Sequence, residues 1–407
     1  MTLPSPGLGA AVFVAAFAVR AGWVVYDWSL RGVALEFGDE RLHWELARNL
    51  IESGTLVSDD GRYAARMPLY PLFLALFGGL GDVGVLLARL AQALLGAATV
   101  WIACRVAGAA FGRRAALVAG LLVGLDPYAV FFSKLLLSET LFTLLLVALC
   151  GCASMASSRA RSQPAWLAAA IAGLGAAAVM TRPSSAGWVV LPWLLLFLDA
   201  DRRRALARVT LSVAVLAACL LAWGVRNRMV LGDPAWLSTN GGVTLYDAQG
   251  PQADGGSNQA FLQELPELRA LNEVERDRRL RELALEQMRR DPGRVLRLAW
   301  VKLLRTWSLT PNVEEYRGGM AGVASAAYTL VVLVLAVAGL WWGRSNWRLH
   351  VLLWTPVVYF TLVHCVYIGS LRYRVPLMPL LAIAAAAAFA ARTGAPEPSG
   401  AVPGKRR

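Results

Sequence analysis

The sequence predicts an all-α polytopic membrane protein, and three observations support this fold class. Hydrophobic residues make up 57% of the 407 residues and charged residues only 16%, against about 45–50% and 25% in soluble domains. The mean hydropathy is correspondingly high, at +0.51. The apolar residues also gather in runs of roughly 20, the length that an α-helix needs to cross a bilayer. We therefore expect a bundle of about ten transmembrane helices with interfacial helices and outer-face loops.

The apolar runs give the expected spans in chain order. They are Leu8–Tyr26, Val83–Cys104, Ala115–Phe132, Leu136–Ala153, Ala165–Met180, Gly187–Leu198, Leu206–Val225, Val323–Trp342, Leu349–Ile368 and Val375–Ala391. The run Leu69–Leu80 is too short to cross, and we expect a half-buried or re-entrant piece there, or an early start to the second span. Residues 1–391 thus form one integral-membrane domain whose first span is retained. The Pro- and Gly-rich residues 392–407 are expected to be a disordered cytoplasmic tail.

The basic residues predict the orientation of the spans. The net charge of +13 comes mainly from short loops and the tail rather than from a nucleic-acid-binding segment, so no nucleic-acid partner is expected. Basic residues favour the cytoplasmic side, which assigns to it Arg105, Arg113, Arg114, Arg159, Arg161, Arg202, Arg203, Arg204, Arg208, Arg344, Arg348, Lys405, Arg406 and Arg407. The outer loops 27–82 and 226–322 then face the periplasm or exterior of the cell membrane.

The first outer loop contains the longest early polar stretch, Gly38–Pro71. It begins with two adjacent carboxylates, Asp39 and Glu40, and apolar residues then recur at helical spacing: Leu42, Leu46 and Leu50. This pattern predicts a helix lying at the membrane surface, ended by Gly54. Arg66 follows just before the prolines that lead back to the bilayer. A solvated loop without a function would have the same composition. The other outer loops must therefore decide whether this loop belongs to a functional site.

Four further loops place ionisable or polar groups on the same face. They contain Asp126 and Ser138-Glu139, then Thr181-Arg182, then Asn240-Gly241-Gly242, and finally Arg372-Tyr373-Arg374. A single arginine at a membrane boundary usually snorkels or binds a lipid head group. Carboxylates gathered with several arginines instead indicate a site that pairs an acid or base with a phosphate. In an extended segment Arg372 and Arg374 would share one face, with Tyr373 turned away.

The long outer loop divides into segments of different character. Gly241-Gly242 predicts a turn, and Asp247–Gly256 is rich in Gly and Asp and is expected to be irregular. Gln259–Arg290 has the charge density of a soluble amphipathic helix or pair of helices. Val295–Trp307 combines apolar residues, tryptophans and cations, which is typical of an interfacial helix.

Taken together, these motifs resemble one family. The acidic pair, the x-Pro-x-Tyr-Pro return of Met67–Pro71, Ser138-Glu139, Thr181-Arg182-Pro183, Ser238–Gly242 and the closing Arg-Tyr-Arg-x-Pro are similar to membrane glycosyltransferases of the GT-C fold. The branch is that of protein O-mannosyltransferases and aminoarabinose transferases. The resemblance covers about residues 8–391 and rests on the order of six motifs, none of them diagnostic alone.

The resemblance implies transfer of a sugar from a polyprenyl-phosphate carrier to an acceptor at the outer face, with inversion. Its implied catalytic residues are Asp39 and Glu40, and its implied substrate-binding residues are Arg66, Tyr70, Glu139, Arg182, Asn240, Arg372 and Arg374. Aminoarabinose transferases have an acidic residue just before the cation that matches Arg66, whereas this chain has Ala65. That departure argues against the same donor or a metal role.

A transporter or lipid flippase is the alternative function. It would place charges near span centres and repeat its halves, yet only Arg20 and Arg89 interrupt the span centres and no internal repeat is apparent. The residues require no cofactor, and the five cysteines lack metal-ligand spacing, although the chemistry would accommodate a divalent metal. The expected partners are a polyprenyl-phosphate sugar donor and membrane lipid, and the acceptor is open among lipid, glycan and protein.

Overall fold

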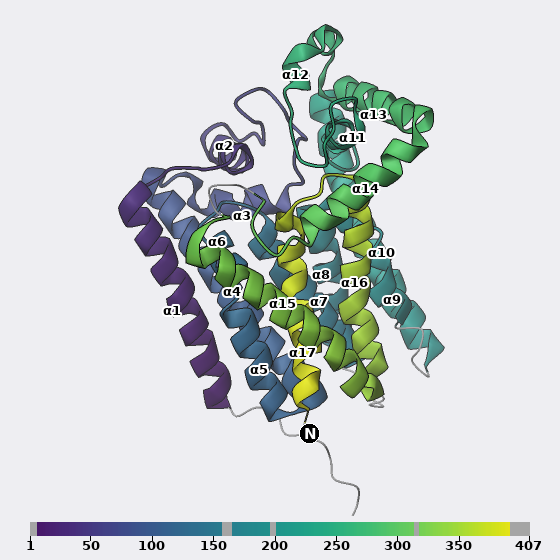
Figure 1. Cartoon of the computed structure of the whole chain (residues 1–407). Coiled ribbons are helices and arrows are strands. Elements are labelled where there is room, and N and C mark those ends of the chain that lie inside the picture. The colour runs from purple at the N-terminus through teal and green to yellow at the C-terminus, as the bar shows by residue number, and fades with distance from the viewer. Residues whose placement is uncertain (1–5, 157–164, 196–200, 313–316, 391–407) are drawn as a thin grey trace, which may run out of the picture.

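The computed structural model describes residues 6–156, 165–195, 201–312 and 317–390. Over these residues the chain forms seventeen α-helices joined by short loops and 3-10 turns, and the described ranges contain no β-strand. Most of the long helices run side by side, and a group of shorter ones lies across one end of the bundle (Figure 1). The expected all-α polytopic fold class is confirmed.

Within the described residues, seven segments are long and apolar enough to cross a membrane. They are α1 (Pro6–Arg31), α4 (Gly81–Phe111), α7 (Glu139–Ala156), α10 (Arg202–Leu231), α15 (Gly319–Trp342), α16 (Trp347–Val366) and the segment Leu371–Phe389, which contains α17 (Met378–Ala386). Each of them overlaps one of the ten expected spans. The remaining three expected spans correspond to shorter helices: one is divided in two, one is the unbroken 17-residue helix α8, and one runs out of the described ranges.

The expected span Ala115–Phe132 is wrong as one continuous helix. It divides into α5 (Arg113–Gly124) and α6 (Pro127–Phe132), because Asp126 caps the second helix by accepting the backbone N–H groups of Tyr128 and Ala129. The side chain of Arg20, on α1, donates to the carbonyl oxygens of Val123 and Gly124 at distances of 3.0 and 3.1 Å. This mid-span arginine therefore satisfies the last carbonyls of the broken helix.

The other two shorter helices are α8 (Ala165–Thr181) and α9 (Val190–Leu195). The helix α8 falls one residue short of an 18-residue span. The expected span Gly187–Leu198 runs from α9 into residues 196–200, which lie outside the described ranges. The predictions for Arg159, Arg161 and the tail 392–407 likewise concern residues outside them.

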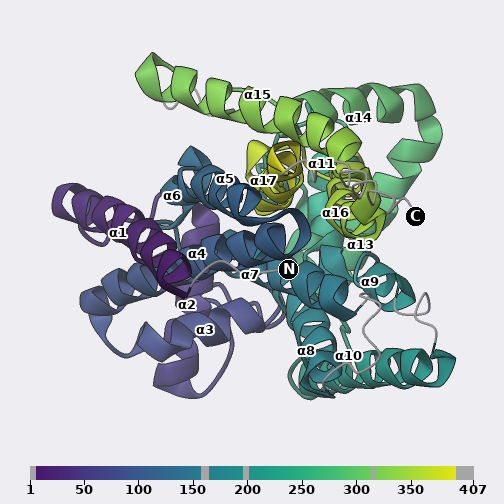
Figure 2. The same cartoon turned by 90° about the horizontal axis from the view of Figure 1, so that it is seen from below.

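The centre of the bundle is formed by α7 and the Leu371–Phe389 segment (Figure 2). In the most apolar 18 residues of these two spans, 67% and 83% of the residues are buried. The corresponding shares in α10 and α1 are only 17% and 22%. Small residues allow close packing here, because a side chain at Gly339 would collide with the carbonyl of Ala384. The more exposed helices at the rim present their apolar side chains outward, as lipid-facing helices do.

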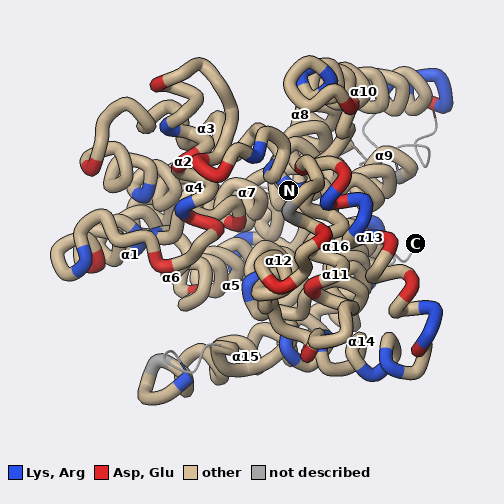
Figure 3. The backbone as a smooth tube through the Cα atoms, turned by 90° about the horizontal axis from the view of Figure 1, so that it is seen from above, with Lys and Arg blue, Asp and Glu red and all other residues tan. Residues whose placement is uncertain are grey.

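Shorter helices cover one end of the bundle, which we call the outer end. They are α2 (Gly38–Ser53), α3 (Leu69–Gly78), α11 (Gly241–Gln249), α12 (Phe261–Glu264), α13 (Glu273–Arg290) and α14 (Pro292–Thr306). Seen from above, both signs of charge occur along α13, the charged residues of α14 are all basic, and the length of α15 is nearly free of charge (Figure 3). We refer to residues 239–306 as the outer unit.

The local predictions for these loops are mostly confirmed. The helix α2 ends at Gly54, whose φ of +71° is the left-handed conformation of a helix C-terminus. The run Leu69–Leu80 forms the separate short helix α3, which is partly buried. Two predictions are wrong. Gly241 begins α11 instead of forming a turn, and α11 extends through Asp247 into the segment expected to be irregular.

Candidate active site

Two carboxylates and three guanidinium groups form an alternating chain of charges at the outer end of the bundle. Asp39 Oδ1 lies 2.6 Å from Arg66 Nη2, and Asp39 Oδ2 lies 2.5 Å from Arg372 Nη1. Glu139 Oε1 accepts hydrogen bonds from Arg372 Nε and, at 2.6 Å, from Arg182 Nη2. The order is therefore Arg66, Asp39, Arg372, Glu139, Arg182, and we call these five residues the charge chain.

Each member of the charge chain comes from a different part of the fold. Asp39 is the second residue of α2, and Glu139 is the first residue of α7. Arg66 precedes α3, Arg182 directly follows α8, and Arg372 lies in the 3-10 helix Leu371–Leu377. The loops at the outer end thus bring together side chains that are up to 333 positions apart in the sequence.

Exposure changes along the charge chain. The Asp39 side chain is 33% exposed and that of Arg372 is 23% exposed, whereas that of Glu139 is fully buried. The Asp39 side of the chain can therefore be reached from solvent, and Glu139 forms its closed side. Three cations and two anions leave one excess positive charge, which suits an anionic ligand such as a phosphate.

The electrostatics keep Asp39 ionised. Burial would raise the pKa of this carboxyl, but the charges of Arg66 and Arg372 outweigh burial and hold the pKa well below its ordinary value of 3.8. The neighbouring imidazole of His43 behaves differently, because burial lowers its pKa to about 3 and leaves it neutral. His43 packs edge-on against the ring of Tyr70, at 4.8 Å between ring centroids.

Glu40 faces away from the charge chain although it adjoins Asp39. Its Oε1 accepts the backbone N–H groups of Glu36 and Phe37 at 2.9 and 3.1 Å, and its Oε2 accepts that of Leu136 at 2.8 Å. The residue is fully buried. Glu40 therefore ties the start of α2 to the segment that leads into α7, and Asp39 is the carboxylate of the pair that a substrate could meet.

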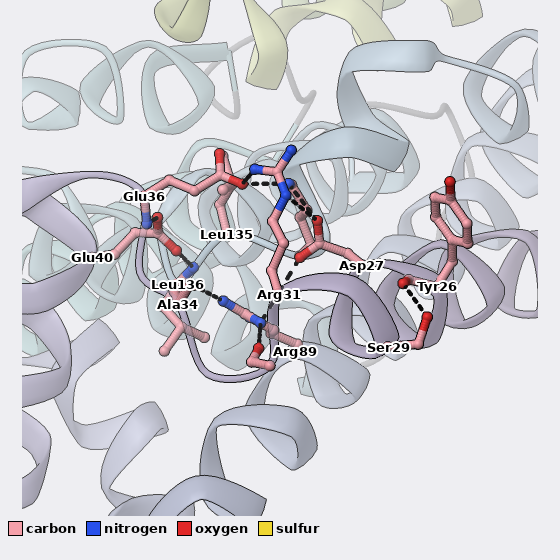
Figure 4. A network of polar contacts seen from close by, with 12 residues as sticks. Tyr26, Asp27, Ser29, Arg31, Ala34, Glu36, Glu40, Arg89, Leu135 and Leu136 are labelled. Atoms are coloured by element: carbon pink, nitrogen blue, oxygen red, sulfur yellow. Dashed lines mark hydrogen bonds and ion pairs between the residues drawn. The ribbon is translucent and has the colours of Figure 1, made fainter.

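A second ionic network, separate from the charge chain, also ties the segment before α2 to the segment that leads into α7 (Figure 4). The buried Lys134 donates to Asp27 at 2.7 Å and to Glu36 at 2.5 Å, and Arg31 lies 2.6 Å from Glu36. Arg89 donates to the carbonyl oxygens of residues 32 and 34. Sequence reasoning missed this network, although a lysine inside an apolar run was a signal that could have found it.

Tyr70 and Asn240 have different surroundings from the charge chain. The Tyr70 hydroxyl donates to Gln92 Oε1 at 2.8 Å, and Tyr70 is fully buried below α2. The Asn240 side chain donates to Thr244 Oγ1 at 3.0 Å at the start of α11. Within the described residues, neither side chain has a hydrogen bond to the charge chain, so both are candidates only for a surrounding role.

The expectation that Arg372 and Arg374 share one face is wrong. The segment Leu371–Leu377 is a 3-10 helix rather than an extended strand, and side chains two apart in such a helix point in different directions. Arg374 is fully buried, donates to the carbonyl of Ser308 and to Thr329 Oγ1, and lies over the ring of Tyr128. Arg372 alone of the two joins the charge chain.

Tyr373 lies close to the charge chain, contrary to the expectation that it turns away. Its ring stacks on that of His364 with centroids 3.7 Å apart, and the Arg182 guanidinium lies 5.9 Å from the Tyr373 centroid. This ring therefore helps to hold Arg182 beside Glu139. The described residues contain no group of three or more His, Cys, Asp or Glu side chains that could hold a metal ion.

Comparison with known proteins supports the resemblance that the motifs indicated. Residues 65–224 match the family model of dolichyl-phosphate-mannose-protein mannosyltransferase. This stretch includes three members of the charge chain, Arg66, Glu139 and Arg182. A comparison with curated proteins found no match.

A similar fold has been observed in an archaeal oligosaccharyltransferase. The archaeal oligosaccharyltransferase AglB from Archaeoglobus fulgidus, in complex with an inhibitory peptide and a dolichol-phosphate, superposes with a TM-score of 0.55 at 14% identity, over 94% of this chain and 50% of that one. The apo form of the Archaeoglobus fulgidus oligosaccharyltransferase gives 0.57 at 13% identity, over 95% and 50%. This chain thus spans about half the length of that enzyme.

A looser likeness is to ArnT from Cupriavidus metallidurans bound to undecaprenyl phosphate, with a TM-score of 0.44 at 18% identity over 94% of this chain and 78% of that one. The family match and the oligosaccharyltransferase superpositions confirm the GT-C fold predicted from the motifs.

Proposed function

We propose that this protein is an inverting glycosyltransferase that moves a sugar from a polyprenyl-phosphate carrier to an acceptor at the outer face of the cell membrane. The observation that carries the proposal is the charge chain, in which one solvent-accessible carboxylate lies between two guanidinium groups at the end of a GT-C bundle. The family match over residues 65–224 and the dolichol-phosphate bound in the archaeal relative support a lipid-linked donor.

The arginines would bind the donor phosphate. As the bond between the anomeric carbon and the phosphate oxygen breaks, negative charge grows on the leaving phosphate, and fixed cations lower the barrier. Arg66 and Arg372 are the two groups closest to the exposed carboxylate. Glu139 and Arg182 would act behind them, because Glu139 holds Arg372 and Arg182 in place through one oxygen atom.

Asp39 would act as the base. An acceptor hydroxyl attacks the anomeric carbon from the side opposite the phosphate, the new glycosidic bond forms, and the hydroxyl proton passes to the carboxylate. A donor phosphate and Asp39 compete for the same two guanidinium groups. Phosphate binding would therefore withdraw cations from Asp39 and raise its basicity at the moment when a proton must be accepted.

The test is donor-dependent transfer by the purified protein in proteoliposomes, with labelled polyprenyl-phosphate sugars and a panel of lipid, glycan and peptide acceptors. We expect wild-type protein to transfer the label and Asp39→Asn to lose turnover by a factor of about 100 or more, since general-base catalysis is typically worth about 10²–10⁴-fold. Asp60→Asn, a change at an exposed carboxylate of the same loop, is the matched control and should keep wild-type rates.

A variant of the adjacent carboxylate, Glu40, distinguishes an effect on catalysis from an effect on folding. Glu40→Gln leaves one of three backbone N–H groups without its acceptor, which should cost about 1–3 kcal/mol of stability while part of the turnover remains. Equal, near-wild-type activity in Asp39→Asn and Glu40→Gln would remove Asp39 from the reaction. Movement of the labelled lipid between leaflets without any transfer would replace the transferase by a flippase.

A further inference from the structure

We infer that Glu273, a residue of the outer unit, is a positioning residue for Arg66. It acts by binding the backbone two and three residues before that arginine. The inference rests on the proposed function in that Arg66 is taken to bind the donor phosphate. Glu273 lies on α13, far from Arg66 in sequence, and no motif in the chain points to it.

The contacts are those of a carboxylate that organises a loop. Glu273 Oε2 accepts the backbone N–H of Tyr63 at 2.7 Å, and its Oε1 accepts that of Ala64 at 3.0 Å and the hydroxyl of Thr239. The Ala64 carbonyl in turn accepts the N–H of Thr239 at 2.9 Å. Glu273 itself is 9% exposed, so these bonds are shielded from water and hold the segment firmly.

A cation binds the same part of the loop through carbonyl groups. Arg226, near the end of α10, donates to the carbonyl oxygens of Tyr63 and Leu56 at 2.6 and 2.5 Å. Its guanidinium also lies 5.0 Å from the Trp223 ring centroid. The N–H groups of residues 63 and 64 thus face an anion while carbonyl groups of the segment face a cation, which leaves the backbone little freedom to shift.

The position of this backbone is passed directly to the Arg66 side chain. Ala64 and Ala65 are essentially fully buried, and Arg66 Nη1 donates to the Ala65 carbonyl at 3.0 Å while its Nη2 contacts Asp39. The guanidinium is therefore fixed between its own backbone and Asp39. A displacement of residues 63–65 moves the Ala65 carbonyl and the Arg66 backbone, and with them the anchor of the guanidinium beside Asp39.

The outer unit has a similar attachment to the segment before the other arginine that pairs with Asp39. Gly369, three residues before Arg372, donates its N–H to the Gly255 carbonyl at 3.1 Å, and Lys302 donates to the Val366 carbonyl at 2.9 Å. Both arginine-bearing segments are thus bound to residues 239–306. This arrangement distinguishes Glu273 from a carboxylate that stabilises only its own helix.

The experiment compares Glu273→Gln with Glu282→Gln, a change at an exposed carboxylate on the same helix. Four quantities are measured: backbone amide exchange at residues 63–64, the rate at which phenylglyoxal modifies Arg66, donor KM, and kcat. Arg182 serves as the internal reference for modification. We expect Glu273→Gln to speed exchange and Arg66 modification severalfold and to raise donor KM about ten- to a hundredfold, with a smaller change in kcat, since small misplacements of a binding group have effects of this size.

An unchanged rate of Arg66 modification in a folded Glu273→Gln protein would overturn the inference, and so would faster modification with an unchanged donor KM. If the wild-type protein transfers no sugar, the proposed function fails, whereas exchange and modification still report whether Glu273 positions Arg66. Should Glu273→Gln not fold, Thr239→Val removes only the hydroxyl bonded to Glu273. It should shift the same quantities in the same direction by less, and no shift would count against the inference.

Discussion

Asp39 and Glu40 are adjacent at the start of α2, but their surroundings give the two carboxylates opposite properties. Asp39 meets two guanidinium groups and stays partly exposed, whereas Glu40 is sealed among backbone amides. The consequence extends to their titration, because burial raises the pKa of Glu40 while the pKa of Asp39 is held well below its ordinary value. Of these two carboxylates, only Asp39 combines negative charge and accessibility with a neighbouring guanidinium group that a phosphate could bind.

The low pKa of Asp39 makes a prediction about pH. A carboxylate whose folded pKa lies below its unfolded value contributes stability above the unfolded pKa and loses it as the pH falls through the folded pKa. Asp39 should therefore remain ionised, and wild-type kcat/KM should show no acid limb from this group between about pH 5 and 8. His43, with a pKa of about 3, stays neutral over the same range.

Removing one cation supplies the test of that prediction. Arg66→Gln takes away one of the two positive charges that lower the pKa of Asp39, so the Asp39 pKa should rise and the acid limb of kcat/KM should move to higher pH. The measurement is the full pH profile of both proteins. A wild-type acid limb above pH 5 that Arg66→Gln does not move would assign the limb to another group.

The two arginines of the closing motif should respond differently to lysine. Arg372 contacts Asp39 through Nη1 and Glu139 through Nε, a fork that a lysine cannot reproduce. Loss of a charge-assisted contact of about 1.5–3 kcal/mol predicts a donor KM raised about ten- to a hundredfold in Arg372→Lys. Arg374→Lys should instead lower the thermal midpoint and leave donor KM near wild type, because Arg374 binds Ser308 and Thr329.

Donor KM and the thermal midpoint, measured on both variants, separate these effects. A donor KM raised equally by the two substitutions would mean that Arg374 reaches the phosphate and that its buried contacts do not persist with donor bound.

At the scale of single elements, α14 has two faces that the sequence already separates. Leu298, Lys302 and Thr306 are buried against the rest of the protein, while Leu296, Trp300 and Leu304 are 74%, 61% and 54% exposed. Both sets recur every four residues, so each forms one stripe along the helix. An exposed apolar stripe with a tryptophan on a helix that descends toward the bundle (Figure 1) is typical of contact with the bilayer interface.

The prediction for α14 is that Trp300 lies in the interface. A nitroxide attached to Trp300→Cys in proteoliposomes should collide with oxygen more often than with a water-soluble nickel reagent. The matched control is Glu282→Cys on α13, which should show the opposite preference because its side chain is exposed and polar. Equal accessibility of the two positions to the nickel reagent would place α14 in water.

At the scale of the whole molecule, the fold separates a charged end from a lipid-facing body. The charge chain draws on α2, α7, the residue after α8 and the 3-10 helix before α17, so the site exists only when both halves of the chain have packed. Its location at the bundle end would let a polyprenyl tail remain in the bilayer while the phosphate meets the arginines.

The orientation of the whole molecule makes the last prediction. After the partly exposed cysteines are replaced by serine, Gln252→Cys in the outer unit should react with an impermeant thiol reagent in intact cells. Ser345→Cys, in the turn between α15 and α16 at the opposite end (Figure 1), should react only after lysis. Both positions are exposed in the structure, so accessibility alone does not separate them. The reverse pattern would put the charge chain on the cytoplasmic side.

The sequence by itself determined the features that depend on neighbouring residues. Apolar run lengths predict the seven long spans, and the 3.6-residue period together with Gly54 predicts α2 and its end. The prolines and glycines around Leu69–Leu80 predict a piece too short to cross the bilayer there, which the structure forms as the separate helix α3. The collection of charges on one face also followed from the order of the loops, because hydropathy and charge bias act locally.

Only the tertiary structure decided which of those charges meet. Asp39 rather than Glu40 enters the charge chain because Leu136, nearly a hundred residues away, supplies the amide that turns Glu40 aside. Arg374 does not join the charge chain because its segment is a 3-10 helix with three residues per turn. In an extended backbone its side chain would point to the same face as that of Arg372. The role of Glu273 could not be predicted from the sequence because its partners before Arg66, Tyr63 and Ala64, contribute only backbone N–H groups, which every residue except proline possesses.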